Sequence, residues 1–157
     1  MKKFIKWLFV ILVFLQASVL IAGVVIFRMP LPDHDIDVSG LPLTDFVEVI
    51  RDERGIPHIY GTNVDDILFA QGYVHAQDRF WQLEFWSHLS TGRLASLIGE
   101  PGVGADLLFR TFGFNRVALE EYETLPPEFK QDLINYTNGI NAYIESRPQR
   151  SLSLEHF

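Results

Sequence analysis

A long apolar run opens the chain. Residues 7–27 are apolar or small at every position except Gln16 and Ser18. A helix of this length spans the roughly 30 Å hydrocarbon core of a bilayer. A buried helix of a soluble domain is the alternative, but such a helix normally keeps a polar face, and this one has none. The pattern therefore predicts a helix that crosses a membrane.

The charges that flank this run indicate its orientation. Lys2, Lys3 and Lys6 precede it, and only Arg28 follows it. The positive-inside rule then leaves the N-terminus in the cytoplasm and the rest of the chain periplasmic or extracellular. A cleaved signal peptide is the other interpretation, but the run is longer than a usual signal core and lacks well-placed small residues for cleavage. We favour a single-pass membrane anchor over residues 1–28.

The pattern after the anchor is extended. Residues 29–43 are rich in proline and aspartate, which favours an extended linker over a packed element. Residues 46–50 are mostly β-formers, residues 55–57 read Gly-Ile-Pro, which is a turn signal, and residues 58–60 resume the extended pattern. This order predicts a hairpin-like pair of strands.

From Asn63 the apolar period becomes that of a helix. Asn63 can cap its N-terminus, and Asp65 and Asp66 fall in the first turn, where the helix dipole favours acids. The apolar residues predicted to face inward are Ile67, Val74, Trp81, Phe85 and Leu89. We expect a helix of about 25 residues that ends near Gly92.

Shorter helices are expected in the second half. Residues 93–98 predict a helical turn, and the glycines and proline of residues 99–104 predict a loop. Helical spacing returns in residues 107–112 and 117–122. Pro126-Pro127 starts a further helix, which ends near Arg147-Pro148 and whose expected inward side is Phe129, Leu133, Tyr136 or Thr137, Ile140 and Ile144.

Three regions follow from these patterns. Residues 1–28 form the anchor or signal segment, residues 29–43 the linker, and residues 44–157 the region expected to fold. The last residues, 151–157, are an apolar stretch without a polar tail or a closing element. We therefore expect this region to be an incomplete part of a larger domain.

Composition and charge narrow the functional classes. The chain is 48% hydrophobic, enough to build a core. All 20 acidic residues but only 9 of the 13 basic ones lie after Arg28, so that part carries a net charge of −11, against −7 for the whole chain. Such a surface repels phosphate backbones and argues against nucleic acid as a partner. The absence of cysteine excludes disulfides, thiolate metal sites and a cysteine nucleophile within this chain.

Three stretches, taken in order, carry a family resemblance. Residues 49–60 read VIRDERGIPHIY, residues 72–84 read GYVHAQDRFWQLE, and residues 92–95 read GRLA. Together they resemble the beginning of the α-chain region in the penicillin acylase (penicillin amidase) family, and the resemblance extends from about residue 44 to residue 143.

The resemblance implies an N-terminal nucleophile hydrolase with an αββα sandwich fold. Of this fold the chain would supply a mostly helical α+β part, preceded by the transmembrane helix. In this family a precursor cuts itself to expose a serine at a new N-terminus. The serine attacks acyl amides such as a β-lactam side chain or an acyl-homoserine lactone, with its own amine as base. The implied partners are the rest of the precursor and an acyl-amide substrate, and the implied cofactor is Ca²⁺.

The resemblance places neither the nucleophile nor the calcium ligands within residues 1–157. We therefore assign no catalytic, cofactor-binding or metal-binding residue to this chain and expect it to be inactive alone. The alternative is a membrane-tethered binding or scaffold protein that kept the acylase-like region and lost the nucleophile. The sequence leaves open the acyl chain that is cleaved and the oligomeric state.

Several polar residues invite a functional interpretation, and a structural one is favoured for each. Positions three apart on a helix share a face, so His75, Asp78, Gln82 and Glu84 suggest a metal site, but the pattern is not HExxH. We expect Asp78 and Arg79 to fix the long helix against the sheet through a polar network. Three charges of the predicted hairpin are expected at its surface: Arg51, Asp52 and Arg54.

His58 follows Pro57 in the predicted second strand, and without a serine in a nucleophile setting it is expected to be structural. An aromatic group covers more than one face of the long helix and consists of Phe80, Trp81, Phe85 and Trp86. Aromatic residues can line an acyl pocket, but core packing is the favoured interpretation.

Overall fold

The computed structural model describes residues 2–28, 31–32, 34–35 and 37–147. This part of the chain is mostly helical and contains one two-stranded sheet. Its elements, in chain order, are α1 (Lys2–Arg28), β1 (Glu48–Arg51), β2 (Pro57–Tyr60), α2 (Val64–Ser90), α3 (Ala95–Ile98), the 3₁₀ turn η1 (Glu100–Gly102), α4 (Val103–Phe112), α5 (Phe114–Thr124) and α6 (Pro127–Ser146). The expected mostly helical α+β character is therefore confirmed for the described residues.

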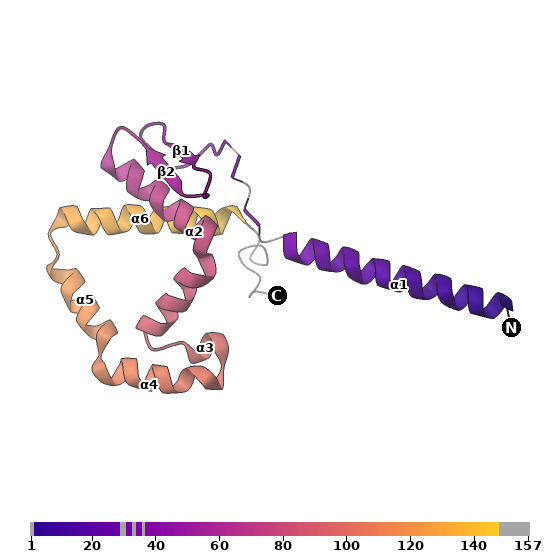
Figure 1. The fold of residues 1–157 in the computed structure, drawn as a ribbon. Helices are drawn as coiled ribbons and strands as arrows, with labels where there is room; N and C mark the ends of the chain where they lie inside the picture. The colour runs from indigo at the N-terminus through magenta and orange to yellow at the C-terminus, as the bar shows by residue number, and fades with distance from the viewer. Residues whose placement is uncertain (1, 29–30, 33, 36, 148–157) are drawn as a thin grey trace.

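Helix α1 stands apart from the rest of the molecule. It projects away from the other elements in Figure 1, and none of the residues in its apolar stretch Phe9–Arg28 is buried within the chain. Among the described residues it is the one helix long and apolar enough to cross a membrane. These properties are compatible with either a membrane anchor or a signal peptide.

The predicted hairpin forms with a shorter first strand. β1 and β2 pair antiparallel, with Val49 opposite Ile59 and Arg51 opposite Pro57. The Asp52 carboxylate closes the turn by accepting hydrogen bonds from the N–H groups of Arg54 and Ile56, each at 2.9 Å. Gly55 has a φ of +76°, which glycine adopts without strain.

Helix α2 confirms the predicted start and stop signals. The side chain of Asn63 accepts a hydrogen bond from the N–H of Asp66, and the helix ends at Ser90, two residues before Gly92. Gly92 has a φ of +64°, which suits the turn that follows. An interruption that the periodicity did not predict occurs at Arg79, where φ is −138° and ψ is 31°. The helix is therefore kinked between a first half, residues 64–78, and a second half, residues 80–90.

The core lies where the first half of α2 crosses α6. Gly72 and Gly139 are buried at this crossing, and a Cβ atom on either would overlap the backbone of the other helix. Tyr73 packs edge-on against Tyr143, with ring centroids 5.3 Å apart. Tyr143 is 2% exposed, and Ala76 is fully buried beside it. Backbone approach through two glycines therefore defines the core.

The predicted inward faces were partly wrong. Val74 is buried as expected, but Ile67, Trp81, Phe85 and Leu89 are only half-buried. On α6, Phe129 and Leu133 are about half exposed, and the buried residues are Gly139 and Tyr143. The search for large apolar side chains missed the real contact, because the smallest residues allow the closest approach of the two backbones.

The segment between α2 and α6 contains more helix than predicted. Gly104, expected in a loop, lies inside α4, and α5 begins at Phe114 rather than at residue 117. The Asp106 carboxylate, on α4, accepts hydrogen bonds from the N–H groups of Leu94 and Ala95 at 2.5 and 2.9 Å. This buried carboxylate stabilises the turn after α2. From there the chain continues through α4 and α5 and returns to α6 (Figure 1).

The structure does not test the predictions for the C-terminal stretch, for parts of the linker or for the boundaries of the three regions. The apolar C-terminal stretch at residues 151–157 lies outside the described residues, as do parts of the linker at residues 29–30, 33 and 36. The boundaries of the three regions stay predictions.

Candidate functional site

A two-point polar contact between distant segments joins the hairpin to α2. Both terminal nitrogens of Arg51 on β1 contact the Asp78 carboxylate, with Nη1–Oδ2 at 2.8 Å and Nη2–Oδ1 at 2.9 Å. Nη2 also donates to Oε1 of Gln77 at 2.9 Å, and Nη1 donates to the carbonyl of Gly55 at 3.1 Å. Planar two-point pairing of this kind is the strong form of a charged hydrogen bond.

This network corrects one prediction and confirms another. Arg51 was expected at the hairpin surface, but its side chain is only 16% exposed and pairs with Asp78. Asp52 and Arg54 are exposed, as expected. Asp78 does fix α2 against the sheet, whereas its neighbour Arg79 is exposed and marks the kink. A third segment also reaches Asp78, because Nε2 of His34 lies 3.3 Å from Oδ1.

A second carboxylate, Asp66, holds the chain that leads into the hairpin. Its oxygens accept hydrogen bonds from the N–H groups of Thr44 and Asp45 at 3.0 and 2.8 Å, and from the Asn63 side chain at 2.6 Å. The Asn63 hydrogen bond, followed by the Thr44 N–H, lowers the pKa of this carboxyl below its ordinary value. Asp66, in the first turn of α2, thus holds the backbone that precedes β1. The sequence analysis explained Asp66 only by the helix dipole and did not predict this contact.

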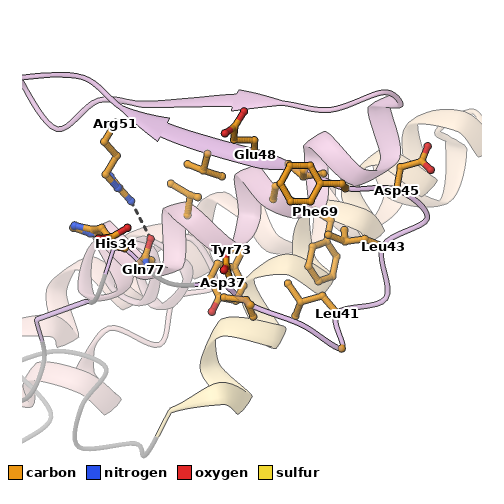
Figure 2. Close-up of a pocket in the computed structure, with 18 residues that line it drawn as sticks. His34, Asp37, Leu41, Leu43, Asp45, Glu48, Arg51, Phe69, Tyr73 and Gln77 are labelled. Atoms are coloured by element: carbon orange, nitrogen blue, oxygen red, sulfur yellow. Dashed lines mark hydrogen bonds between the residues drawn. The ribbon is translucent and has the colours of Figure 1, made fainter.

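A groove lies between these two anchoring points. It has a volume of about 780 Å³ and runs between residues 37–49 and the first half of α2. Figure 2 shows Phe69 and Tyr73 of α2 on one side, with Leu41 and Leu43 of the incoming segment nearby. Asp35, Asp37, Asp45 and Glu48 also line it. The groove is therefore apolar along α2 and acidic around it.

The two histidines considered from the sequence lie in structural contacts. Nδ1 of His75 lies 2.8 Å from the Tyr136 hydroxyl and links α2 to α6, and burial raises the pKa of Tyr136. Nε2 of His58 lies 3.6 Å from the Asp52 carboxylate on the hairpin. The pKa of Asp52 is lowered, chiefly by the Ile56 N–H and also by His58.

The candidate metal ligands of α2 do not form a cluster. Asp78 is paired with Arg51, and His75 contacts Tyr136. Within the described ranges no three histidine, aspartate or glutamate side chains lie together as a possible metal site. The residues present in this part of the chain therefore do not fit a calcium ion, and the calcium prediction concerns ligands elsewhere.

The aromatic group of α2 lies in the second half of the helix, after the kink at Arg79. Phe85 lies between its neighbours, with ring centroids 6.4 Å from Trp81 and 5.8 Å from Trp86. Trp86 is 56% exposed, whereas Phe80 and Trp81 are half-buried. Packing within the described residues therefore accounts for only part of this aromatic surface.

Serine hydroxyls in the described part of the chain contact nearby backbone carbonyls. The hydroxyls of Ser90, Ser96 and Ser146 donate to backbone carbonyls three residues earlier. In the described part of the chain no serine hydroxyl bonds a histidine side chain, so this part presents no serine–histidine pair for nucleophilic catalysis. Its polar residues connect segments of the fold.

Comparison with known proteins defines the class. The sequence profile described as penicillin amidase matches residues 46–157, which is most of the chain. The solved structure of a thermostable penicillin G acylase from Alcaligenes faecalis superposes with a TM-score of 0.58 at 27% identity, over 64% of this chain and 54% of that chain. The chain belongs to the penicillin amidase family.

Curated relatives carry two kinds of acylase name. The chain is 40% identical over 118 residues to penicillin acylase 2 proenzyme of Pseudomonas sp. strain SE83, which covers 75% of this chain and 15% of the relative. It is 36% identical over 102 residues to the acyl-homoserine lactone acylase QuiP of Pseudomonas putida, which covers 65% of this chain and 12% of the relative. The chain thus spans less than a sixth of the length of these relatives.

The Arg51–Asp78 pair is the main contact that the sequence analysis missed. The two residues are 27 positions apart, but they lie in the first two stretches that carry the family resemblance. Opposite charges on neighbouring predicted elements were a usable signal, because a helix packed on a hairpin brings such side chains within reach. The high charge of the hairpin led instead to the prediction that Arg51 is exposed to solvent.

Proposed function

We propose that this chain is the N-terminal part of a precursor whose mature form hydrolyses acyl groups from linear amides. The observation that carries the proposal is the family match over residues 46–157. The relatives' names, penicillin acylase and acyl-homoserine lactone acylase, share the cleavage of an acyl amide and differ in the amine that is released. The proposed substrate class is therefore an acyl amide, without a choice between these two amines.

The proposed chemistry is that of an N-terminal nucleophile hydrolase. A peptide bond of the precursor is cut, and the freed residue, a serine, attacks the amide carbonyl while its own α-amine takes the proton. Backbone or side-chain donors stabilise the oxyanion. We assign none of these groups to residues 1–157. Their proposed part is to join the hairpin to the helices through Arg51 and Asp78, within an αββα fold completed by the rest of the precursor.

The lengths of the matched proteins support maturation by cleavage. The matched region is 54% of the solved penicillin G acylase chain but only 12–15% of the curated relatives. The solved chain is thus several times shorter than those relatives, and one of them is named a proenzyme. This is the difference in length expected between a mature chain and an uncut precursor.

The decisive experiment uses the complete gene product. We expect two chains on a denaturing gel and release of the chromophore from a chromogenic phenylacetyl or long-chain acyl amide. N-terminal sequencing of the second chain identifies the nucleophile, and its replacement by alanine should abolish both cleavage and turnover. A product that stays uncut and inactive contradicts the proposal and favours the membrane-tethered scaffold instead.

Residues 1–157 alone should have no amidase activity. Loss of one oxyanion donor costs other enzymes roughly 100- to 1,000-fold in rate, and here the nucleophile would be missing as well. The same chromogenic amides test this expectation, and turnover by the purified segment would contradict it.

The calcium proposal concerns the whole precursor, because the described residues do not fit the ion. Removal of Ca²⁺ from the complete product with a chelator should lower its melting temperature, and adding Ca²⁺ back should restore it. A product whose thermal unfolding is unchanged by chelation contains no structural calcium.

The proposed location is the membrane, with α1 as an uncleaved anchor and the rest of the chain outside the cytoplasm. We expect the complete product to stay with membranes after an alkaline carbonate wash and to keep an intact Met1 end by mass spectrometry. A soluble product that begins between residues 18 and 24 identifies a signal peptide instead.

A further inference from the structure

The chain between α1 and β1 lies along the first half of α2. At one end of that half, the Asp66 carboxylate holds the N–H groups of Thr44 and Asp45. At the other end, Nε2 of His34 lies 3.3 Å from Oδ1 of Asp78. Asp78 follows Asp66 by 12 residues in α2, which is about 18 Å at 1.5 Å per residue. The segment that leads into the hairpin therefore runs antiparallel to α2 over about three helical turns.

Apolar side chains hold the part of this segment next to the hairpin. Leu41 and Leu43 are half-buried, whereas Pro42 between them is exposed. The two leucines line the groove beside Phe69 and Tyr73 of α2, as Figure 2 shows. Alternation of this kind is typical of an extended segment with one side packed against the fold. This part of the predicted linker is therefore packed along the helix.

A further contact lies close to α1. The N–H of Leu31 donates to the carbonyl of Arg28, the last residue of α1, at 3.2 Å. The carbonyl of Leu31 accepts a hydrogen bond from Nη2 of Arg147 at 3.4 Å. Arg147 directly follows α6, and its guanidinium lies over the ring of the buried Tyr143, 5.8 Å from the centroid. The C-terminal end of α6 is thus joined to the chain just after α1.

These contacts shorten the connection between α1 and the fold. Asp45 follows Arg28 by 17 residues, and a free chain of that length reaches about 55 Å. Leu31 follows Arg28 by only 3 residues, which is a reach of about 10 Å. A fold that is held at Leu31 therefore stays close to the end of α1, whereas a fold held only at Asp45 can move over a wide range.

We propose that the described residues between Leu31 and Asp45 form a strap that holds the folded region next to the membrane, with the C-terminal end of α6 toward the bilayer. This inference rests on the proposed function, in which α1 is an uncleaved anchor. In Figure 1 the C-terminal end of α6 lies near α1, and its N-terminal end points away. Transmembrane helices are tilted by only about 20° on average, so the end of α6 that is near α1 is also the end near the bilayer.

Limited proteolysis of the complete gene product tests whether the strap is fastened. An endoproteinase that cuts before aspartate can act at the exposed Asp35 and Asp37. Such a cut requires local opening, and its rate follows the population of the open form. His34→Ala combined with Arg147→Ala removes the two side chains that fasten the strap near α1 and should speed these cuts by about tenfold or more. Mass spectrometry of the products identifies both positions.

A matched double variant changes the same two residue types on the hairpin. Arg54 is exposed in the turn and His58 contacts Asp52, so Arg54→Ala combined with His58→Ala should be cut at the wild-type rate. His34→Ala alone leaves α6 unchanged and should still speed the cuts about threefold, so the test does not depend on how well the Arg147 variant folds. Equal rates for the wild type and both strap variants overturn the proposal.

Energy transfer to the bilayer tests the orientation. A fluorescent amino acid is incorporated at Glu145 or at Glu128, two exposed glutamates about 25 Å apart along α6. The complete product is inserted into phosphatidylcholine vesicles whose headgroups carry an acceptor dye. Transfer from position 145 should exceed transfer from position 128 about twofold or more, because position 145 lies nearer the bilayer by much of this length. Equal transfer from both positions, or stronger transfer from position 128, overturns the orientation.

The outcomes separate this inference from the proposed function. A product that stays in the membrane, cuts itself and hydrolyses amides, but whose strap variants are cut at the wild-type rate, contradicts the strap alone. A product with strap-dependent cutting but without maturation or turnover contradicts the enzymatic proposal alone. A soluble product that begins between residues 18 and 24 contradicts the anchor and with it the placement next to the membrane, and the cutting rates at Asp35 and Asp37 then still decide whether the segment is fastened to the fold.

Discussion

Two glycines allow the backbones of α2 and α6 to touch. A Cβ atom at Gly72 would overlap the carbonyl of Tyr136, and one at Gly139 would overlap the carbonyl of Phe69. Neither backbone carbonyl can move without separating the helices, because both are held in helical hydrogen bonds. Neither glycine has a positive φ. The close approach of the two backbones, and not an unusual backbone conformation, therefore explains why both positions are glycine.

Replacing Gly72 by alanine should destabilise the complete protein by about 3 kcal/mol or more, at the upper end of overpacking effects. Gly104→Ala is the control, because Gly104 lies inside α4 and nothing lies within 4 Å of its Cβ position. That variant should be neutral or up to about 1 kcal/mol more stable, through helix propensity. Urea unfolding of both variants measures the difference, and equal stabilities would contradict the close crossing.

Asp66 should make stability depend on pH in the acid range. Hydrogen bonds from Asn63 and the Thr44 N–H lower its pKa in the folded state. A carboxyl whose folded pKa lies below its unfolded value of about 3.9 stabilises the fold above that value and loses this contribution as pH falls through the folded pKa. Asp66→Asn should therefore be least stable relative to the wild type at neutral pH.

The stability difference between wild type and Asp66→Asn should shrink as the pH falls below about 4. Asp65→Asn changes an exposed aspartate in the same helical turn, one that does not hold the Thr44–Asp45 backbone, and it should keep the wild-type profile. Thermal melts from pH 2 to 7 decide the matter. A constant gap between wild type and Asp66→Asn would mean that the charge of Asp66 is not involved.

At the scale of elements, the hairpin and the kinked helix form one unit through Arg51 and Asp78. The side chains are 16% and 22% exposed, and two parallel hydrogen bonds join them. Partial burial reduces solvent screening, and two-point geometry restricts the pair to one arrangement. The helix changes direction at the residue after Asp78, so the pair also lies where the second half of α2 begins.

A double-mutant cycle with Arg51→Ala and Asp78→Ala should give a coupling free energy of about 1–2 kcal/mol. The exposed pair of Arg116 and Glu120 on α5, with side chains 69% and 64% exposed, is the comparison and should give about 0.5 kcal/mol or less. Chemical denaturation of the complete product measures both cycles. Coupling of the first pair no larger than that of the second would mean that the hairpin and α2 are held together by other contacts.

At the scale of the whole molecule, few residues are buried and many large apolar ones are exposed. The buried hydrophobic residues among those described are Phe69, Ala70, Val74, Ala76, Leu94 and Tyr143. Outside α1, Leu107, Phe112, Phe114 and Phe129 are each at least 50% exposed. Apolar surface of this extent favours contact with further polypeptide.

Residues 29–157 expressed without the rest of the gene should therefore be aggregation-prone. We expect strong binding of the dye ANS and unfolding without a sharp transition, because so little apolar surface is buried within the segment. Co-expression with the downstream sequence should yield a soluble complex. A monomeric segment with a cooperative melt would contradict this expectation and indicate a self-sufficient domain.

The sequence by itself determined the elements and the family. The Asn63 cap, the Gly92 stop, the Pro127 start and the long apolar run at the N-terminus depend on neighbours a few residues away, and all four appear in the structure. Three short motifs in the right order were sufficient for the resemblance, and the family match confirmed it.

Only the tertiary structure decided which residues meet. Arg51 meets Asp78, Asp66 meets the N–H of Asp45, and Gly72 meets the backbone of Tyr136. Each of these partners lies 21 or more positions away, and the apolar period does not contain that information. Periodicity ranks large apolar residues as inward, but the crossing of α2 and α6 is set by glycines, because the distance between backbones limits every contact around them.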